Sequence, residues 1–146
     1  YQIIHLCGKG NIDKLYNNRS GYVQFEYAGK ELRDMFALSS LVISRAGANA
    51  ICELLALHKP NILIPLSAAA SRGDQILNAR SFEKQGYSYV IEEENLTKET
   101  LDAAIKKVMT EKETYISNMK SSQQLDSIHT ILKLIEEASE KKKKKA

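Results

Sequence analysis

Short apolar runs and longer amphipathic stretches alternate along the first two thirds of the chain. Runs rich in β-branched residues and bounded by Gly, Pro or Asn predict strands, and stretches with a helical period predict helices. The predicted strands cover residues 1–7, 22–27, 41–44, 61–65 and 87–91. The predicted helices cover residues 11–18, 30–38, 48–57 and 74–85, one that starts at Thr97, and a helical end over 111–140.

This alternation predicts the fold class. The segments 41–44 and 61–65 are almost wholly apolar, which is typical of parallel strands buried on both faces. Such strands, joined by helices, predict a sheet covered by helices on both sides. We therefore predict an α/β fold with a Rossmann-like doubly wound parallel sheet and C-terminal helices over residues 1–140, followed by a basic tail at 141–146.

Charge and composition exclude several functions. The net charge of +3 comes from the lysine run 141–145, and the remaining chain is mildly acidic. An acidic body argues against a nucleic-acid partner. The tail is a solvated end or, alternatively, a contact to an anionic membrane surface. Cys7 and Cys52 lack metal-ligand spacing and are expected to be buried thiols. No apolar run approaches the ~18 residues of a membrane span.

The connection after the strand 41–44 carries the first candidate chemistry. It runs SRAGANA over residues 44–50 and enters a helix through small side chains. Open amides at a helix start bind anions, so we expect a diphosphate there. Glu53 follows on the same helix, where a carboxylate could accept both hydroxyls of a ribose. The alternative is a tight turn followed by a surface glutamate.

The connection over residues 67–75, SAAASRGDQ, is the second candidate binding segment. Small residues followed by Arg72, Asp74 and Gln75 suit a loop that contacts a polyhydroxylated ligand, and we expect Asp74 to cap the next helix. The alternative is an ordinary loop. The acidic run 92–94 predicts a solvated turn without a counter-residue, and the three histidines form no catalytic triad.

Two segments carry a family resemblance. Residues 44–66 (SRAGANAICELLALHKPNILIPL) and 74–86 (DQILNARSFEKQG) resemble the C-terminal domain of the MurG family. The resemblance implies half of a GT-B glycosyltransferase, in which this domain holds the donor UDP-GlcNAc. The family transfers GlcNAc to lipid I and forms lipid II in peptidoglycan synthesis.

The resemblance also implies roles for individual residues. The diphosphate would contact Ala48, Asn49 and Ala50, and Glu53 would bind the ribose. Gln75 would contact the GlcNAc hydroxyls. Asp74 stands where the family has His or Gln, and the segment Tyr27-Ala28 would lie against the uracil. Because backbone amides neutralise the phosphates, we expect no metal and no cofactor.

The same resemblance places the remaining machinery outside this chain. The acceptor site, the general base and the membrane-docking patch belong to the family's N-terminal domain, so we expect a cytoplasmic enzyme peripheral to the inner face of the cell membrane. The family's first strand of this domain would precede Tyr1 and leave a gap in the sheet before residue 41. Two alternatives stay open: a separate subunit of a split lipid-linked GlcNAc transferase, or a UDP-sugar hydrolase of similar fold.

Overall fold

The computed structural model describes residues 1–70, 72–122 and 135, and the chain divides into two compact units. The first unit spans Tyr1–Ser40 and the second Leu41–Ala146. Each unit is built on its own parallel sheet, with two strands in the first and three in the second. The parallel strands, joined by helices in the second unit, confirm the predicted α/β class.

The first unit contains the strands β1 (Ile3–Leu6) and β2 (Tyr22–Phe25), which pair in parallel, and the helix α1 (Leu32–Leu38). The helix predicted over residues 11–18 is wrong. Only the 3-10 turn η1 (Lys14–Tyr16) forms there, because the Asp13 side chain accepts the Leu15 amide and the backbone turns away directly afterwards.

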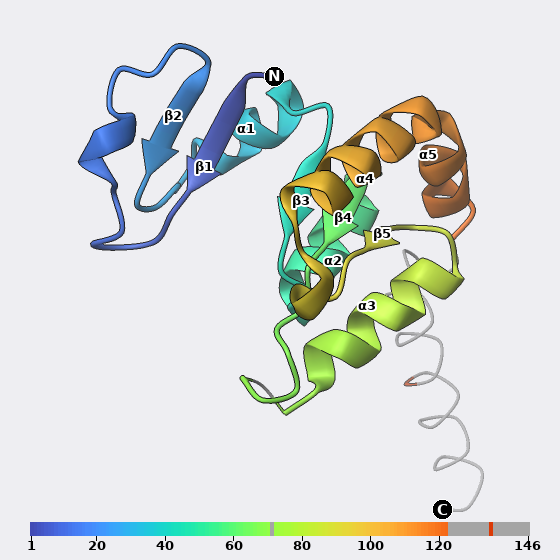
Figure 1. Ribbon diagram of the computed structural model, residues 1–146. Helices are drawn as coiled ribbons and strands as arrows, with labels where there is room; N and C mark the ends of the chain where they lie inside the picture. Colours follow the sequence, from blue (N-terminus) through green and yellow to red (C-terminus); the bar gives the residue numbers. More distant parts are fainter. Residues whose placement is uncertain (71, 123–134, 136–146) are drawn as a thin grey trace, which may run out of the picture. The chain divides into compact units, whose positions relative to one another are not determined.

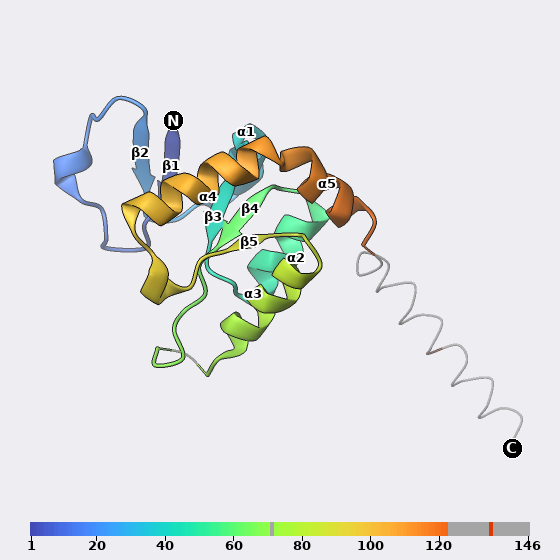
Figure 2. The same cartoon turned by 45° about the vertical axis from the view of Figure 1, so that its right-hand side comes forward.

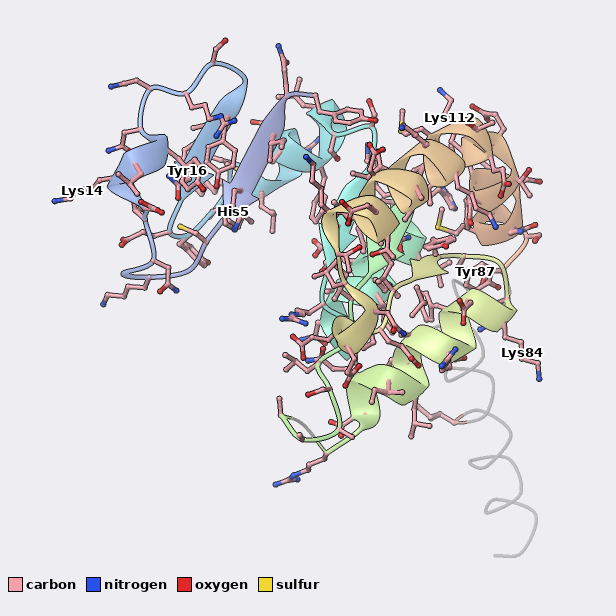
Figure 3. All side chains as sticks on the ribbon, in the orientation of Figure 1. His5, Lys14, Tyr16, Lys84, Tyr87 and Lys112 are labelled. Atoms are coloured by element: carbon pink, nitrogen blue, oxygen red, sulfur yellow. The ribbon has the colours of Figure 1, made fainter. Side chains whose placement is uncertain are left out.

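A polar and aromatic cluster lies on this small sheet. His5 Nδ1 and the Tyr22 hydroxyl share a hydrogen bond of 2.6 Å, and the rings of Tyr16 and Tyr22 lie 5.6 Å apart, centroid to centroid. Figure 3 labels His5 on β1 and Tyr16 on η1. These contacts tie η1 to the strand pair.

In the second unit the strands follow the order β3–β4–β5, all parallel. Their bounds are β3 Val42–Ser44, β4 Asn61–Leu63 and β5 Tyr89–Val90. The central strand β4 is buried along its whole length. The expectation that residues 41–44 are buried on both faces is wrong, since Ile43 is 45% exposed. The reason is position: β3 has a partner strand on one side only within the described residues.

Helices cover both faces of this sheet (Figures 1 and 2). The helices α2 (Ala48–Ala56) and α3 (Asp74–Lys84) lie on one face, and α4 (Lys98–Thr110) packs against β4 from the other. The 3-10 turn η2 (Glu93–Asn95) leads into α4, and α5 (Lys112–Lys120) follows it. This arrangement explains why β4 is the most buried strand.

The core of the second unit is built from apolar side chains of these layers. The largest fully buried apolar side chains are Leu54, Ile62, Leu63, Val108 and Met119. Tyr87, labelled in Figure 3, packs edge-on against Phe82 of α3, with 5.6 Å between the ring centroids. Thr97 caps α4 through a reciprocal capping box with Thr100, as its place at the helix start predicts.

The C-terminal prediction is tested only in part. Of the helical end predicted over 111–140, α5 forms the first portion, and residues 123–134 and 136–146, with the lysine run, lie outside the described residues. Among the helices that the structure describes, none is both long and apolar enough to span a membrane.

Candidate functional site

The turn from β3 into α2, residues 45–47, leaves the start of the helix open. Gly47 is the N-cap and has no side chain to accept an amide. The first backbone bond of the helix runs from the Ile51 amide to the Gly47 carbonyl at 3.0 Å. Within the part of the chain that the structure describes, no acceptor meets the amides of Ala48, Asn49 and Ala50. These donors share the positive end of the helix dipole, which favours an anion.

Nothing in the fold requires a glycine at position 47. Its φ of −66° and ψ of 142° are accessible to every residue type. A Cβ placed on Gly47 would meet no atom within 4 Å. The absence of a side chain therefore leaves open space at Gly47 itself, immediately before the amides of residues 48–50.

Glu53 lies on the exposed side of α2. It stands one turn after Asn49, and residues four apart are neighbours on the surface of a helix. No protein group in the described residues bonds this carboxylate. The opposite side of the helix is buried through Ile51, Leu54 and Leu55. The helix thus presents donors at its start and an acceptor one turn later.

The loop from β4 into α3, residues 64–73, forms the second side of the site. The N-cap of α3 is Gly73 in the left-handed conformation (φ 88°), so the expectation that Asp74 caps this helix is wrong. Asp74 is instead the first helical residue, and its exposed carboxylate complements the helix dipole. The Gln75 side-chain oxygen accepts the Leu66 amide at 3.1 Å.

The two sides are tied together by α3. The Asn78 side-chain amide donates to the Ala46 carbonyl at 3.1 Å. This bond joins the turn that follows β3 to the helix that carries Gln75. The starts of α2 and α3, which carry the predicted residues 48–50, 74 and 75, therefore lie at one edge of one sheet, at the carboxyl ends of its strands, and Glu53 follows one turn further along α2.

A connection that the sequence did not predict runs through Glu93. Its carboxylate contacts Arg45 Nη2 at 2.7 Å and accepts the Ser67 amide at 3.1 Å. Arg45 Nη1 also donates to the Ile64 carbonyl at 3.2 Å. The Ser67 amide and the Arg45 guanidinium hold the pKa of Glu93 below its usual value. Glu93 thus joins the loops that follow β3, β4 and β5.

Residues 92–94 do form a turn, as predicted, but the expectation that they have no counter-residue is wrong. Besides Glu93 with Arg45, Glu92 pairs with Arg80 of α3. Both arginines lie well before the acidic run in the sequence, which is why spacing alone could not identify the pairs. A hollow of about 250 Å³ adjoins the acidic run 92–94. It is lined by Pro65, Leu66, Ser67, Ala68, Ile76, Glu92, Glu93 and Glu94.

The remaining predicted residues lie elsewhere. Tyr27 is 82% exposed and Ala28 is buried, and both belong to the first unit, so their part in the site stays a prediction. Cys52 is exposed on α2 and Cys7 is half-buried, so the expectation of buried thiols is wrong. Residues 1–70 and 72–122 contain no cluster of three or more His, Cys, Asp or Glu side chains that could hold a metal ion.

Known proteins match this chain over almost its full length. The profile of the glycosyltransferase family 28 C-terminal domain matches residues 1–143. A UDP-N-acetylglucosamine--N-acetylmuramyl-(pentapeptide) pyrophosphoryl-undecaprenol N-acetylglucosamine transferase of Lachnoclostridium phytofermentans is 64% identical over 137 residues, which cover 94% of this chain and 39% of the relative. The protein of the same name from Lachnospira eligens is 60% identical over 139 residues, 95% of this chain and 39% of the relative.

A solved structure shows the same fold. The crystal structure of Acinetobacter baumannii MurG matches with a TM-score of 0.73 at 20% identity, over 93% of this chain and 40% of that one. This likeness confirms the predicted Rossmann-like fold. The chain spans about two fifths of the length of the relatives it matches.

Proposed function

Because the chain belongs to the family of glycosyltransferase family 28 C-terminal domains, we propose that it is the UDP-GlcNAc-binding part of an inverting N-acetylglucosaminyltransferase. The complete enzyme would transfer GlcNAc to lipid I and form lipid II in peptidoglycan synthesis. The names of the relatives support this substrate pair. The observation that carries the proposal is the open helix start, with Glu53 exposed one turn beyond it.

The helix start would bind the diphosphate of the donor. The amides of Ala48, Asn49 and Ala50 can donate to phosphate oxygens, and the dipole of the nine-residue α2 adds positive potential. When the acceptor hydroxyl attacks the anomeric carbon, the bond to the β-phosphate oxygen breaks and negative charge grows on UDP. Donors already aimed at that charge lower the barrier without reorganising.

The other polar groups would recognise the two sugars. The Glu53 carboxylate can accept both ribose hydroxyls, since it has no other partner in the described part of the protein. Gln75 would donate to a GlcNAc hydroxyl, while Asp74, which only accepts when ionised, lies beside it at the start of α3. Tyr27 and Ala28 of the first unit would lie against the uracil.

The acceptor and the general base would come from a part of the enzyme outside this chain. The relatives' names include a pyrophosphoryl-undecaprenol, which is a lipid-linked acceptor. We accordingly place the complete enzyme at the inner face of the bacterial cell membrane, peripherally bound. Sedimentation of the complete enzyme with lipid vesicles, compared with this chain alone, tests that placement.

Calorimetry tests the donor specificity. The chain is titrated with UDP-GlcNAc and with GDP-mannose, and Glu53→Gln is compared with Glu99→Gln, which makes the same charge change on α4. We expect the chain to bind UDP-GlcNAc and to bind GDP-mannose at least about tenfold more weakly. Of the two variants, only Glu53→Gln should lower the affinity for UDP-GlcNAc. Equal binding of both nucleotides, or no binding by a folded chain, would contradict the proposal. Release of UDP without an acceptor would favour the hydrolase alternative.

A further inference from the structure

We propose that Glu93 is a positioning residue for the donor sugar: it holds the start of the β4–α3 loop so that Gln75 presents its amide nitrogen to the site. The inference rests on the proposed function and extends it to a residue that touches no substrate. Glu93 sits on η2, after β5, and reaches the loops that follow the two other strands of the sheet.

Two neighbouring amides of the loop are held by two side chains. Glu93 accepts the Ser67 amide at 3.1 Å, and the Gln75 oxygen accepts the Leu66 amide at 3.1 Å. Of the two polar atoms of the Gln75 amide only the oxygen can accept a hydrogen bond, so the Leu66 amide determines which way the Gln75 side chain is turned. Its oxygen faces the loop, and its nitrogen, which no protein group in the described residues accepts, is left to donate to a ligand.

The carboxylate of Glu93 is itself held in place. Arg45 Nη2 lies 2.7 Å from Glu93, and Arg45 Nη1 donates to the Ile64 carbonyl at 3.2 Å, at the start of the same loop. Loop, arginine and glutamate therefore form one connected set of charge-assisted hydrogen bonds, which are stronger than neutral ones. Loss of Glu93 removes the ion pair and the acceptor of the Ser67 amide together.

The start of α2 keeps anchors that do not involve Glu93. Asn78 holds the Ala46 carbonyl at 3.1 Å, and Arg45 keeps its bond to Ile64. Removal of Glu93 is therefore expected to loosen the loop before Gln75, which would contact the sugar. The start of α2, which would bind the diphosphate, should stay in place. A general loss of stability would weaken both sides equally, so the ratio of two affinities separates positioning from folding.

The test compares UDP-GlcNAc with UDP by calorimetry on this chain. We expect Glu93→Ala to lower the affinity for UDP-GlcNAc about tenfold and the affinity for UDP less than about twofold. Glu93→Gln should fall between Glu93→Ala and the unchanged chain, because its amide oxygen can still accept from Ser67 but forms no ion pair. Glu99→Gln should alter neither affinity. Circular dichroism verifies that each variant is folded.

The outcomes separate this inference from the proposed function. If the unchanged chain binds UDP-GlcNAc more tightly than UDP and Glu93→Ala leaves that ratio intact, the positioning role is overturned and the proposed function stands. Equal weakening of both ligands overturns it as well. If the folded, unchanged chain binds neither ligand, the proposed function itself fails and the inference fails with it.

Discussion

The two units of this protein contain similar apolar strands in very different surroundings. All four residues of β1 are exposed, whereas all three residues of β4 are buried. The difference comes from neighbours: β4 has a strand on each side and helices on both faces, while β1 pairs with β2 alone among the described residues. An apolar run therefore predicts a strand, but the number of partners decides its burial.

The largest expected effect of this difference is on stability. Ile62 on β4 is completely buried and Ile3 on β1 is 50% exposed. We expect Ile62→Ala to lower the free energy of unfolding by about 2–5 kcal/mol and Ile3→Ala by less than about 1 kcal/mol. Urea denaturation of the two variants measures both. Equal losses would mean that the two strands are buried to the same extent in solution.

A second pair of variants tests the residues proposed for donor binding. Gly47→Asp improves the N-cap of α2 but places a negative charge in front of its open amides. We expect unchanged or slightly higher stability and about 100-fold weaker UDP-GlcNAc binding. Tyr27→Ala should lower the affinity for UDP-GlcNAc about tenfold, as loss of a stacked base does. Calorimetry measures the affinities and thermal unfolding the stabilities, and normal donor binding by Gly47→Asp would contradict the proposed diphosphate site.

Two glycines provide a smaller contrast between packed and open surroundings. Both adopt positive φ, 70° at Gly86 and 78° at Gly10. A Cβ on Gly86 would lie 2.5 Å from Asn118 Nδ2, whereas a Cβ on Gly10 would meet nothing within 4 Å. We expect Gly10→Ala to cost about 1 kcal/mol of unfolding free energy through backbone strain and Gly86→Ala about 1 kcal/mol more. If Gly10→Ala and Gly86→Ala had the same midpoint of urea unfolding, the expected difference in stability between them would be contradicted.

The smallest expected effect is the response of the Glu93 network to acid. The Ser67 amide and Arg45 lower the pKa of Glu93 in the folded protein. A lowered pKa contributes stability above the unfolded-state value of about 4.3, and this contribution disappears as pH falls through the folded-state value. Glu93→Gln should therefore reduce the loss of stability on acidification. Unfolding free energies of this variant and of the unchanged chain, measured from about pH 7 to about pH 3, test this expectation, and equal losses would contradict it.

The sequence predicted the strands, most helices and the open start of α2, because these depend on local pattern and on small residues after an apolar run. It did not predict the partners of Glu92 and Glu93, since Arg80 and Arg45 come from other elements that only the folded sheet edge brings together. The wrong cap at Asp74 has a local cause: Gly73 takes the left-handed conformation and shifts the start of α3.

The central claim, that the open amides of α2 bind a diphosphate, is tested most directly by nuclear magnetic resonance. Backbone amide signals of the chain are followed during titration with UDP. We expect the amides of Ala48, Asn49 and Ala50 to shift most and to saturate together. If UDP binds while these three signals stay in place, the diphosphate lies elsewhere and the claim is wrong.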